Sequence, residues 1–205
     1  MRLLKQLKTE NEKTSAFEGD SFILNEIKEI IKNYNIKTFI ETGTNEAKTT
    51  KVMSDLVDNV HTIELNETFY ENCKNTLKDF KNVSIHNGSS EKVLNELLPN
   101  VGDNIIFYLD AHWYSYCPIL DELDTIYQNG KKNSIIIIHD FYVPDSDLGY
   151  MKTPGNTSVD DGPILNFEFI EDKLNLIYEN NFDYYYNTES DGNPRTGVIF
   201  IIPKK

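Results

Sequence analysis

Residues 37–47 read KTFIETGTNEA, and the fold prediction starts from this segment. An apolar, β-branched run ends at Gly43 and is followed by residues with helical spacing, which is typical of a strand, a tight turn and a helix. A glycine at such a turn lets a ligand approach the backbone, and the helix N-terminus offers free N–H groups. A dinucleotide-binding fingerprint would continue with two more glycines, but Asn45 and Ala47 stand there, so close approach of a pyrophosphate is disfavoured.

Further runs of the same kind predict a parallel sheet. They are NVHTIEL at 59–65, NVSIHN at 82–87, NIIFYLD at 104–110 and NSIIIIHD at 133–140. Helical spacing follows each of the first four runs, which is the βαβα alternation of an α/β fold. The last two runs lack polar alternation, as expected for central strands covered on both faces.

The C-terminal part of the chain predicts a helix over 164–178 and two more strands at 182–187 and 196–202. The turn-rich segment ESDGNPR joins these strands, so the chain is expected to end in an antiparallel β-hairpin. The predicted fold is therefore a Rossmann-like, seven-stranded, mostly parallel sheet with helices on both faces.

The length of 205 residues predicts one domain, which we place at 21–205, preceded by a polar arm at 1–20. Within the domain, residues 141–163 are rich in Pro, Gly and Asp and interrupt the alternation of strands and helices. A loop of that length inside a compact domain is typically a lid, a binding loop or a disordered insert. We expect a lid-like loop that is the best candidate for choosing the substrate.

Composition and charge exclude several classes of partner. The chain is 39% hydrophobic and 26% charged, which is typical of a globular protein, and its net charge of −13 disfavours nucleic acids and anionic membranes as partners. No stretch approaches the ~20 apolar residues of a spanning helix, and the N-terminus lacks the apolar core of a secretory signal. Two cysteines are too few for a disulfide framework, so we expect reduced thiols and a cytoplasmic location.

Polar residues follow the second and third predicted strands. Glu64 stands about twenty residues after Glu41, where nucleoside-binding α/β folds keep an acid for the ribose hydroxyls; it could instead cap the next helix. The third strand leads into Gly88, Ser89 and Ser90, again a glycine before a helix start, and capping alone could explain both serines.

Two aspartates follow the fourth and fifth strands. The carboxyl ends of neighbouring parallel strands meet at one edge, so Asp110 and Asp140 are expected to lie close together. They would either repel each other, which raises a pKa, or share a hard cation through their oxygens. A lone aspartate at a strand end is usually a helix cap, but these two are flanked by His112 and His139.

Taken in order from residue 39 to residue 140, these motifs resemble a class I S-adenosylmethionine-dependent methyltransferase. They are most similar to the catechol O-methyltransferase-like enzymes and to the related bacterial small-molecule and sugar O-methyltransferases. The resemblance implies that S-adenosylmethionine is the cofactor. The cofactor-binding residues that it implies are Glu41, Gly43, Thr49, Glu64, Gly88, Ser89, Ser90, Asp110, His112 and Trp113.

The resemblance also implies individual roles. Gly43 would face the methionine part of the cofactor, Thr49 would hold its carboxylate, Glu64 would bind the ribose and Ser90 would lie at the adenine. Trp113 would pack near the adenine or the acceptor. Asp110 and Asp140 match two of the protein ligands of a catalytic magnesium ion.

The chain departs from this family at two positions. The third magnesium ligand is an Asn in the catechol-type enzymes and is Phe141 here, and their catalytic Lys is replaced by Tyr114. Two mechanisms therefore stay open. A cation on Asp110 and Asp140 would lower the pKa of the acceptor hydroxyl, or else a histidine, His112 or His139, would act as the base, with Asp110 beside it.

The prediction is thus methyl transfer to a small hydroxyl compound such as a sugar. Because acids crowd the expected crevice, a neutral or cationic acceptor is favoured over an anionic one. Two alternatives remain: an NAD(P)-dependent oxidoreductase, which the strand and helix pattern also permits, and an inactive S-adenosylmethionine-binding protein. Nothing in the sequence indicates the oligomeric state.

Overall fold

The computed structural model describes residues 15–111, 116–153 and 162–204. Three residues of the sequence-based predictions, His112, Trp113 and Tyr114, lie outside these ranges, and so do the first fourteen residues of the predicted arm and residues 154–161 of the predicted lid.

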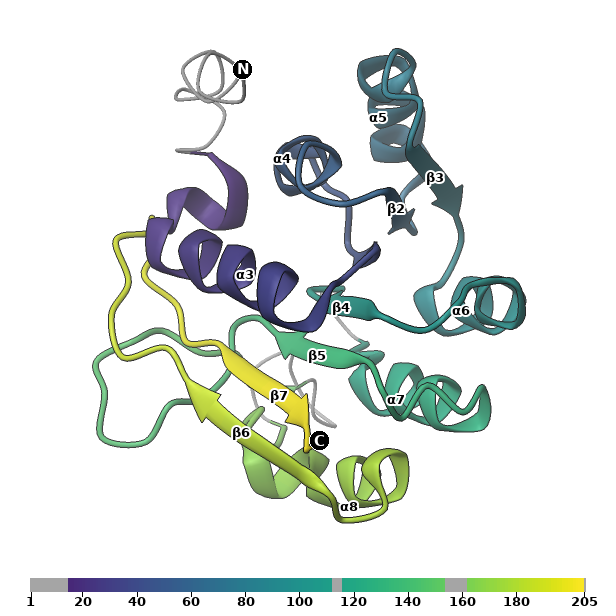
Figure 1. Cartoon of the computed structure of the whole chain (residues 1–205). Helices are drawn as coiled ribbons and strands as arrows, with labels where there is room; N and C mark the ends of the chain where they lie inside the picture. The colour runs from purple at the N-terminus through teal and green to yellow at the C-terminus, as the bar shows by residue number, and fades with distance from the viewer. Residues whose placement is uncertain (1–14, 112–115, 154–161, 205) are drawn as a thin grey trace.

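A seven-stranded sheet runs through the middle of the molecule in the order β3-β2-β1-β4-β5-β7-β6 (Figure 1). The first five strands are parallel, and β7 is antiparallel to both β5 and β6. This confirms the predicted mostly parallel sheet and its C-terminal hairpin. The strands are β1 (Thr38–Thr42), β2 (Asn59–Glu64), β3 (Val83–Asn87), β4 (Ile105–Leu109), β5 (Ile135–Ile138), β6 (Phe182–Tyr186) and β7 (Ile199–Pro203).

Helices cover both faces of the sheet, as predicted (Figure 1). One apolar cluster joins the sheet to α6, α7 and α8, and the other joins it to α3, α4 and the first 3-10 helix. The helical elements are η1 (Ala16–Gly19), α3 (Ser21–Tyr34), α4 (Lys48–Ser54), α5 (Glu67–Leu77), α6 (Ser90–Leu97), η2 (Leu98–Asn100), α7 (Ile119–Gln128) and α8 (Phe167–Tyr178).

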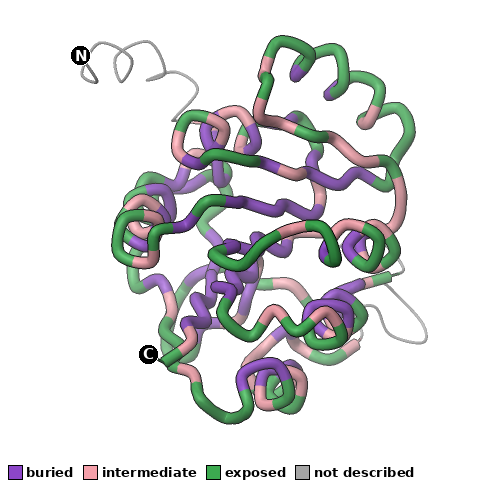
Figure 2. Tube along the Cα trace, turned by 45° about the vertical axis from the view of Figure 1, so that its right-hand side comes forward, coloured by how far each residue is buried: buried purple, intermediate pink, exposed green. Residues whose placement is uncertain are grey.

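Strand β4 shows why the central strands read as unbroken apolar runs. All five of its residues are buried, and Figure 2 shows the buried strands enclosed by partly exposed helices. Alternate side chains of a strand point to opposite faces, so Phe107 packs in the cluster with α6, α7 and α8 while Tyr108 packs in the other. A strand between two helix layers has no solvent-facing side and therefore no polar alternation.

The strand order reverses between β1 and β4, because the chain runs outward to β2 and β3 on one side and to β5 on the other. In open parallel sheets, ligands bind beyond the carboxyl ends of the strands at such a reversal. Strand β1 ends at Thr42, with Gly43 next, and β4 ends at Leu109, with Asp110 next. The candidate residues at the strand ends therefore meet at one edge of the sheet.

The described end of the predicted arm belongs to the core. Ala16 and Phe17 are buried, and the Phe17 ring meets Tyr108 edge-on with ring centroids 5.2 Å apart. The backbone N–H of Phe17 also donates a hydrogen bond to Thr49 Oγ1 of α4, at 3.1 Å. Two residues of the predicted arm, Ala16 and Phe17, therefore pack against the rest of the protein.

The described part of the predicted lid is held by buried side chains and by bridges to residues outside the strands. Phe141 and Leu148 are buried, and isolated bridges join Gly149 to Thr196 and Lys152 to Ile164. None of the helices in the described ranges is long and apolar enough to cross a membrane.

We expect Phe17→Ala to lower the free energy of unfolding by about 3 kcal/mol, because it removes a buried ring and leaves a cavity. Urea unfolding measures the change. The control is Phe22→Ala, whose side chain is 44% exposed, against 2% for Phe17, and which should cost less than about 1 kcal/mol. Equal costs for the two variants would show that the segment before Ser21 is not part of the core.

Candidate functional site

Two cavities lie side by side beyond the carboxyl ends of the strands. The first has a volume of about 510 Å³, and its wall includes Glu64, Ser90 and Tyr116. The second has a volume of about 610 Å³, and its wall includes Asp110 and Asp140. Gly43 and Asn45 line both cavities, so the turn after β1 forms the boundary that the two cavities share.

Gly43 permits the closest approach between the ends of β1 and β4. Its φ is +86°, and a Cβ placed on it would lie 2.7 Å from the backbone oxygen of Asp110. Any side chain there would push the two strand ends apart. Asn45 and Ala47, which stand where further glycines would be expected, also adopt left-handed backbone with φ of 48° and 57°. The backbone of this turn thus adopts conformations that glycine favours. Because Asn45 and Ala47 carry side chains, however, a ligand cannot come as close to the backbone as it could at a turn with three glycines.

The Glu64 carboxylate is held at the first cavity by backbone amides. Its Oε2 accepts a hydrogen bond from the N–H of Asn45 at 2.9 Å, and its Oε1 accepts one from the N–H of Asn66 at 2.8 Å. The N-cap of α5 is Asn66, whose side chain accepts from the first turn of the helix. The alternative interpretation of Glu64 as a helix cap is therefore not supported. A carboxylate can accept further hydrogen bonds, which leaves this group able to bind a ligand.

The two serines at the start of α6 do not act as side-chain caps. Ser89 is the N-cap residue, but its hydroxyl makes no capping hydrogen bond. The Ser90 hydroxyl is buried against the first cavity and has no hydrogen-bond partner in the described part of the chain. A buried polar group without a partner is costly, and in native proteins it usually indicates a ligand, a water or a function.

Glu41 is buried at the wall of the second cavity. Its Oε2 accepts hydrogen bonds from the hydroxyls of Thr50, at 2.5 Å, and Thr62, at 2.7 Å. Burial raises the pKa of this carboxyl to about 8, although the two hydroxyls favour its ionised form. Without a cation nearby, Glu41 is therefore mostly protonated at neutral pH.

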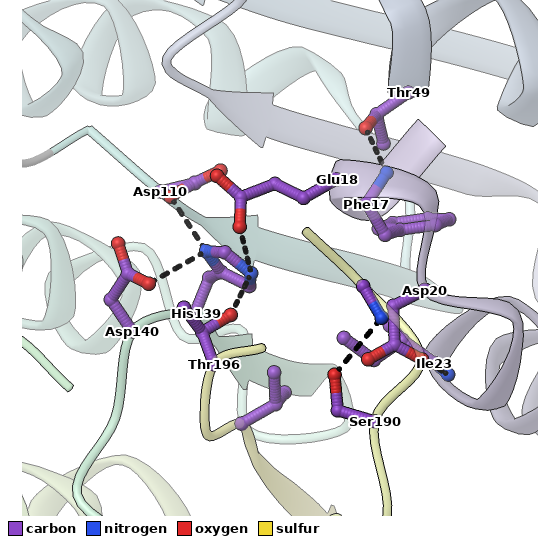
Figure 3. A network of polar contacts seen from close by, with 12 residues as sticks. Phe17, Glu18, Asp20, Ile23, Thr49, Asp110, His139, Asp140, Ser190 and Thr196 are labelled. Atoms are coloured by element: carbon purple, nitrogen blue, oxygen red, sulfur yellow. Dashed lines mark hydrogen bonds and ion pairs between the residues drawn. The ribbon is translucent and has the colours of Figure 1, made fainter. Parts of the chain in front are cut away.

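A polar cluster forms another part of the second cavity (Figure 3). The buried His139 lies beneath it, with Nδ1 at 3.2 Å from Asp110 Oδ1 and at 3.5 Å from Asp140 Oδ1. The other nitrogen, Nε2, shares a hydrogen bond of 2.9 Å with Thr196 Oγ1 and lies 4.0 Å from Glu18 Oε2. The expected proximity of Asp110 and Asp140 is thus present, with an imidazole between them.

These carboxylates decide the charge of His139. Burial by itself lowers the pKa of His139, but the negative charges of Asp110 and Asp140 outweigh it and raise the pKa to about 9. The imidazole is therefore protonated at neutral pH, is buried and does not line either cavity. This arrangement disfavours His139 as the general base that the sequence suggested.

The all-oxygen magnesium site of the catechol-type enzymes does not fit this chain. Its third ligand position is Phe141, whose ring is fully buried and stacks near Tyr186 with ring centroids 6.2 Å apart. The side chain of Phe141 offers no oxygen to replace the third ligand. The carboxylates of Asp110 and Asp140 both face the imidazole edge of His139.

The structure brings the described candidate residues together in two groups. The first cavity collects Gly43, Glu64, Gly88, Ser89 and Ser90. The second collects Glu41, Gly43, Thr49, Asp110 and Asp140.

Sequence reasoning missed Glu18, which also lines the second cavity. Its contact with His139 joins residues far apart in the chain, and no motif surrounds it that could have indicated this. Met151, from the described part of the predicted lid, lines the same cavity. Leu65 and Phe69, which are exposed and line the first cavity, were also missed, although the apolar residue directly after Glu64, the predicted ribose-binding acid, could have suggested them.

No protein-family model matches the sequence, and a comparison with curated protein sequences finds no match. Solved structures do match. The O-methyltransferase TomG from Streptomyces achromogenes, in complex with SAM, has a TM-score of 0.60 at 12% identity, over 88% of this chain and 78% of that chain. An O-methyltransferase from Bacillus cereus, in complex with SAH, has a TM-score of 0.60 at 12% identity, over 87% and 79% of the two chains.

A third match is the precorrin-6y C5,15-methyltransferase from Geobacter metallireducens, with a TM-score of 0.54 at 10% identity, over 86% of this chain and 88% of that chain. The chain has the fold of these methyltransferases. Their names place the methyl group on different acceptors, so the methyltransferase fold does not by itself select one.

We expect Gly43→Ala to destabilise the protein by about 2 kcal/mol or more, because the new Cβ meets a backbone oxygen and the backbone is left-handed. Thermal or urea unfolding measures the loss. The matched control is Gly102→Ala, where a Cβ meets nothing within 4 Å, and its effect should stay within about 0.5 kcal/mol. A stable Gly43→Ala variant would contradict the close approach of β1 and β4.

Proposed function

We propose that this protein transfers a methyl group from S-adenosylmethionine to an oxygen of a small hydroxyl compound. The observation that carries the proposal is the pair of joined cavities at the strand reversal, in which Glu64 and the unpartnered Ser90 hydroxyl line one cavity and the Asp110–Asp140 cluster lines the other. A methyltransferase needs two connected sites, one for the nucleoside part of the cofactor and one for the methyl acceptor.

The first cavity suits the adenosine part of the cofactor. The fixed Glu64 carboxylate can accept hydrogen bonds from both ribose hydroxyls, and the Ser90 hydroxyl can bond to the adenine. Leu65, Phe69 and Tyr116 add exposed apolar surface at the cavity wall, against which an aromatic base can pack.

The second cavity suits the methionine part and the acceptor. The cofactor would pass Gly43, which lines both cavities, and would meet Thr49 and Glu41 beyond the turn. Its ammonium and sulfonium groups carry positive charge, which the carboxylates of this cavity attract. A cation beside Glu41 would also favour the ionised form of this carboxyl.

The reaction is an in-line displacement in which the S–CH₃ bond breaks while an O–CH₃ bond forms. The electron pair of the broken bond returns to sulfur, which becomes a neutral thioether, and the acceptor hydroxyl gives its proton to a base. Alignment of oxygen, methyl and sulfur can supply up to ~7–11 kcal/mol of the barrier reduction.

Among the described residues, the carboxylates of Glu18, Asp110 and Asp140 line the second cavity and could receive this proton, whereas protonated His139 could not. His112 remains a predicted base or cofactor contact.

The charge of the second cavity favours a neutral or cationic acceptor, such as a sugar. Glu18, Asp110 and Asp140 contribute negative groups to its wall. The lysine there, Lys48, is paired with Glu46 at 2.5 Å, so it offers little to an anion. A phosphate-bearing acceptor would therefore meet net repulsion.

The test is the melting temperature with S-adenosylhomocysteine and, separately, with NAD⁺. At about 100 times its Kd, S-adenosylhomocysteine should raise the melting temperature by about 5 °C or more, because it binds only the native state. NAD⁺ should cause no shift, since its pyrophosphate cannot approach the turn at Asn45 and Ala47. A shift with NAD⁺ equal to or larger than that with S-adenosylhomocysteine would overturn the proposal.

Ser90→Ala should move stability and affinity in opposite directions. Removing a buried hydroxyl without a partner should raise the free energy of unfolding of the ligand-free protein by about 1 kcal/mol. Losing the hydrogen bond to the adenine should weaken binding of S-adenosylhomocysteine about fivefold, as measured by calorimetry.

Ser84→Ala, on the exposed side of β3, is the matched control and should change neither quantity. A Ser90→Ala variant that is less stable, or that binds S-adenosylhomocysteine as tightly as the unmodified protein, would contradict the role of Ser90.

A further inference from the structure

We propose that two copies of this chain associate through the outer edge of β6, with their β6 strands antiparallel about a two-fold axis. Strand β6 ends the sheet (Figure 1), and no described strand pairs with its outer side. An open strand edge presents unpaired N–H and C=O groups to any chain that can extend the sheet. The pattern of residues along β6 makes this edge complementary to a second copy of itself.

The main-chain groups of three residues point outward from this edge. The N–H of Asn187, just after β6, donates to the carbonyl of Val198, just before β7. In an antiparallel pair, residues that bond to the same neighbouring strand recur at every second position. Odd-numbered residues of β6 therefore bond to β7. The N–H and C=O groups that point to the outer side belong to Phe182, Tyr184 and Tyr186.

Strand β6 lacks the features by which edge strands usually avoid association. Its sequence, FDYYY, contains no proline and no lysine, and its register with β7 runs without a bulge. Its charged residue, Asp183, is paired with Lys204 at 3.0 Å. The side chains of Tyr184 and Tyr185 are 42% and 38% exposed. The edge therefore presents aromatic surface together with open main-chain groups.

Pairing about Tyr184 uses every outward main-chain group. With the two-fold axis at this residue, Tyr184 faces its own counterpart, and Phe182 faces Tyr186 of the second copy. Each facing pair exchanges two main-chain hydrogen bonds, about six in all. An axis at Asp183 would leave about four bonds and would place two aspartates directly opposite each other, which is destabilising. The charge on the strand therefore favours the register centred on Tyr184.

The side chains favour the same arrangement. Phe167 of α8 stacks on Tyr184 with ring centroids 4.1 Å apart, and Tyr184 meets Tyr186 edge-on at 5.7 Å. A two-fold axis perpendicular to the sheet keeps these rings of both copies on one face, where directly opposed aromatic residues stabilise antiparallel strands. On the other face, Asp183 would lie opposite Tyr185 of the second copy, so no like charges meet. The two copies would thus share one continuous sheet.

Sedimentation velocity of the full chain tests the association. The measurement uses physiological salt, which screens the repulsion between two chains that each carry a net charge of −13. We expect a reversible equilibrium of monomer and dimer with a Kd of about 10 µM or tighter. A monomer at all concentrations up to about 100 µM would overturn the proposal. A larger oligomer would also overturn it, because a symmetric pair of edges closes at two copies.

The substitution Tyr184→Lys should weaken dimerisation at least about tenfold, because it removes an aromatic pair and places two ammonium groups opposite each other at the axis. The matched control is Tyr127→Lys on α7, where the side chain is 46% exposed against 42% for Tyr184. This control should leave the Kd of the dimer unchanged. An undiminished dimer in Tyr184→Lys, or an equal loss in both variants, would contradict an interface at β6.

Disulfide trapping tests the register. A variant that combines Asp183→Cys with Tyr185→Cys should cross-link two copies on oxidation, because facing residues without shared hydrogen bonds lie ~4.5 Å apart at Cα, within the range of a disulfide. Within one chain these positions lie ~6.7 Å apart on the same face, so their Cβ atoms exceed the ~4.5 Å limit of a disulfide.

Tyr185→Cys alone is the control for this experiment. It should not cross-link, because residue 185 faces residue 183 of the second copy and not its own counterpart. The absence of cross-linking in the double variant, or equal cross-linking in the single variant, would overturn the register centred on Tyr184.

Discussion

The contact between Gly43 and the backbone oxygen of Asp110 is the constraint on which the site depends. A Cβ at Gly43 would lie 2.7 Å from that oxygen, so only glycine lets β1 and β4 end this close together. The same turn borders both cavities. A residue with a side chain at position 43 would separate the ends of β1 and β4. The groups that line the two cavities would then move apart, although the proposed cofactor must contact both sets.

Buried charge gives the site its chemistry. The chain carries a net charge of −13, but only a few of its acids lie at the crevice. Burial raises the pKa of Glu41, which lies among hydroxyl groups. The negative charges of Asp110 and Asp140 raise the pKa of the neighbouring His139. The His139 shift shows that the carboxylates at the second cavity favour positive charge there, whereas the Glu41 shift shows that burial favours the neutral carboxyl. The positive charge of the proposed cofactor would meet the same carboxylates.

The segment before α3 ties the cluster to the rest of the domain. Phe17 contacts Tyr108 of β4 and donates to Thr49 of α4, while Glu18 reaches His139. Residues from the two ends of the chain also meet here, since Asn193 holds the Glu18 backbone and Thr196 orients His139. The cluster therefore forms only when the chain folds. Substitutions at Phe17, Asn193 or Thr196 should alter the positions of Glu18 and His139 at the second cavity.

Local sequence patterns were enough to predict the type of each strand and helix along the chain, the two-sided burial of β4 and β5, and the edge of the sheet at which Glu64, Asp110 and Asp140 lie. These follow from local periodicity and from the rule that parallel strands end at one edge. Only the tertiary structure decided that Glu18 reaches His139, that this imidazole is an acid at neutral pH, and that the Phe141 ring lies in the core. The physical reason is that these properties depend on burial and on charges brought together from distant parts of the chain, which no local pattern of residues encodes.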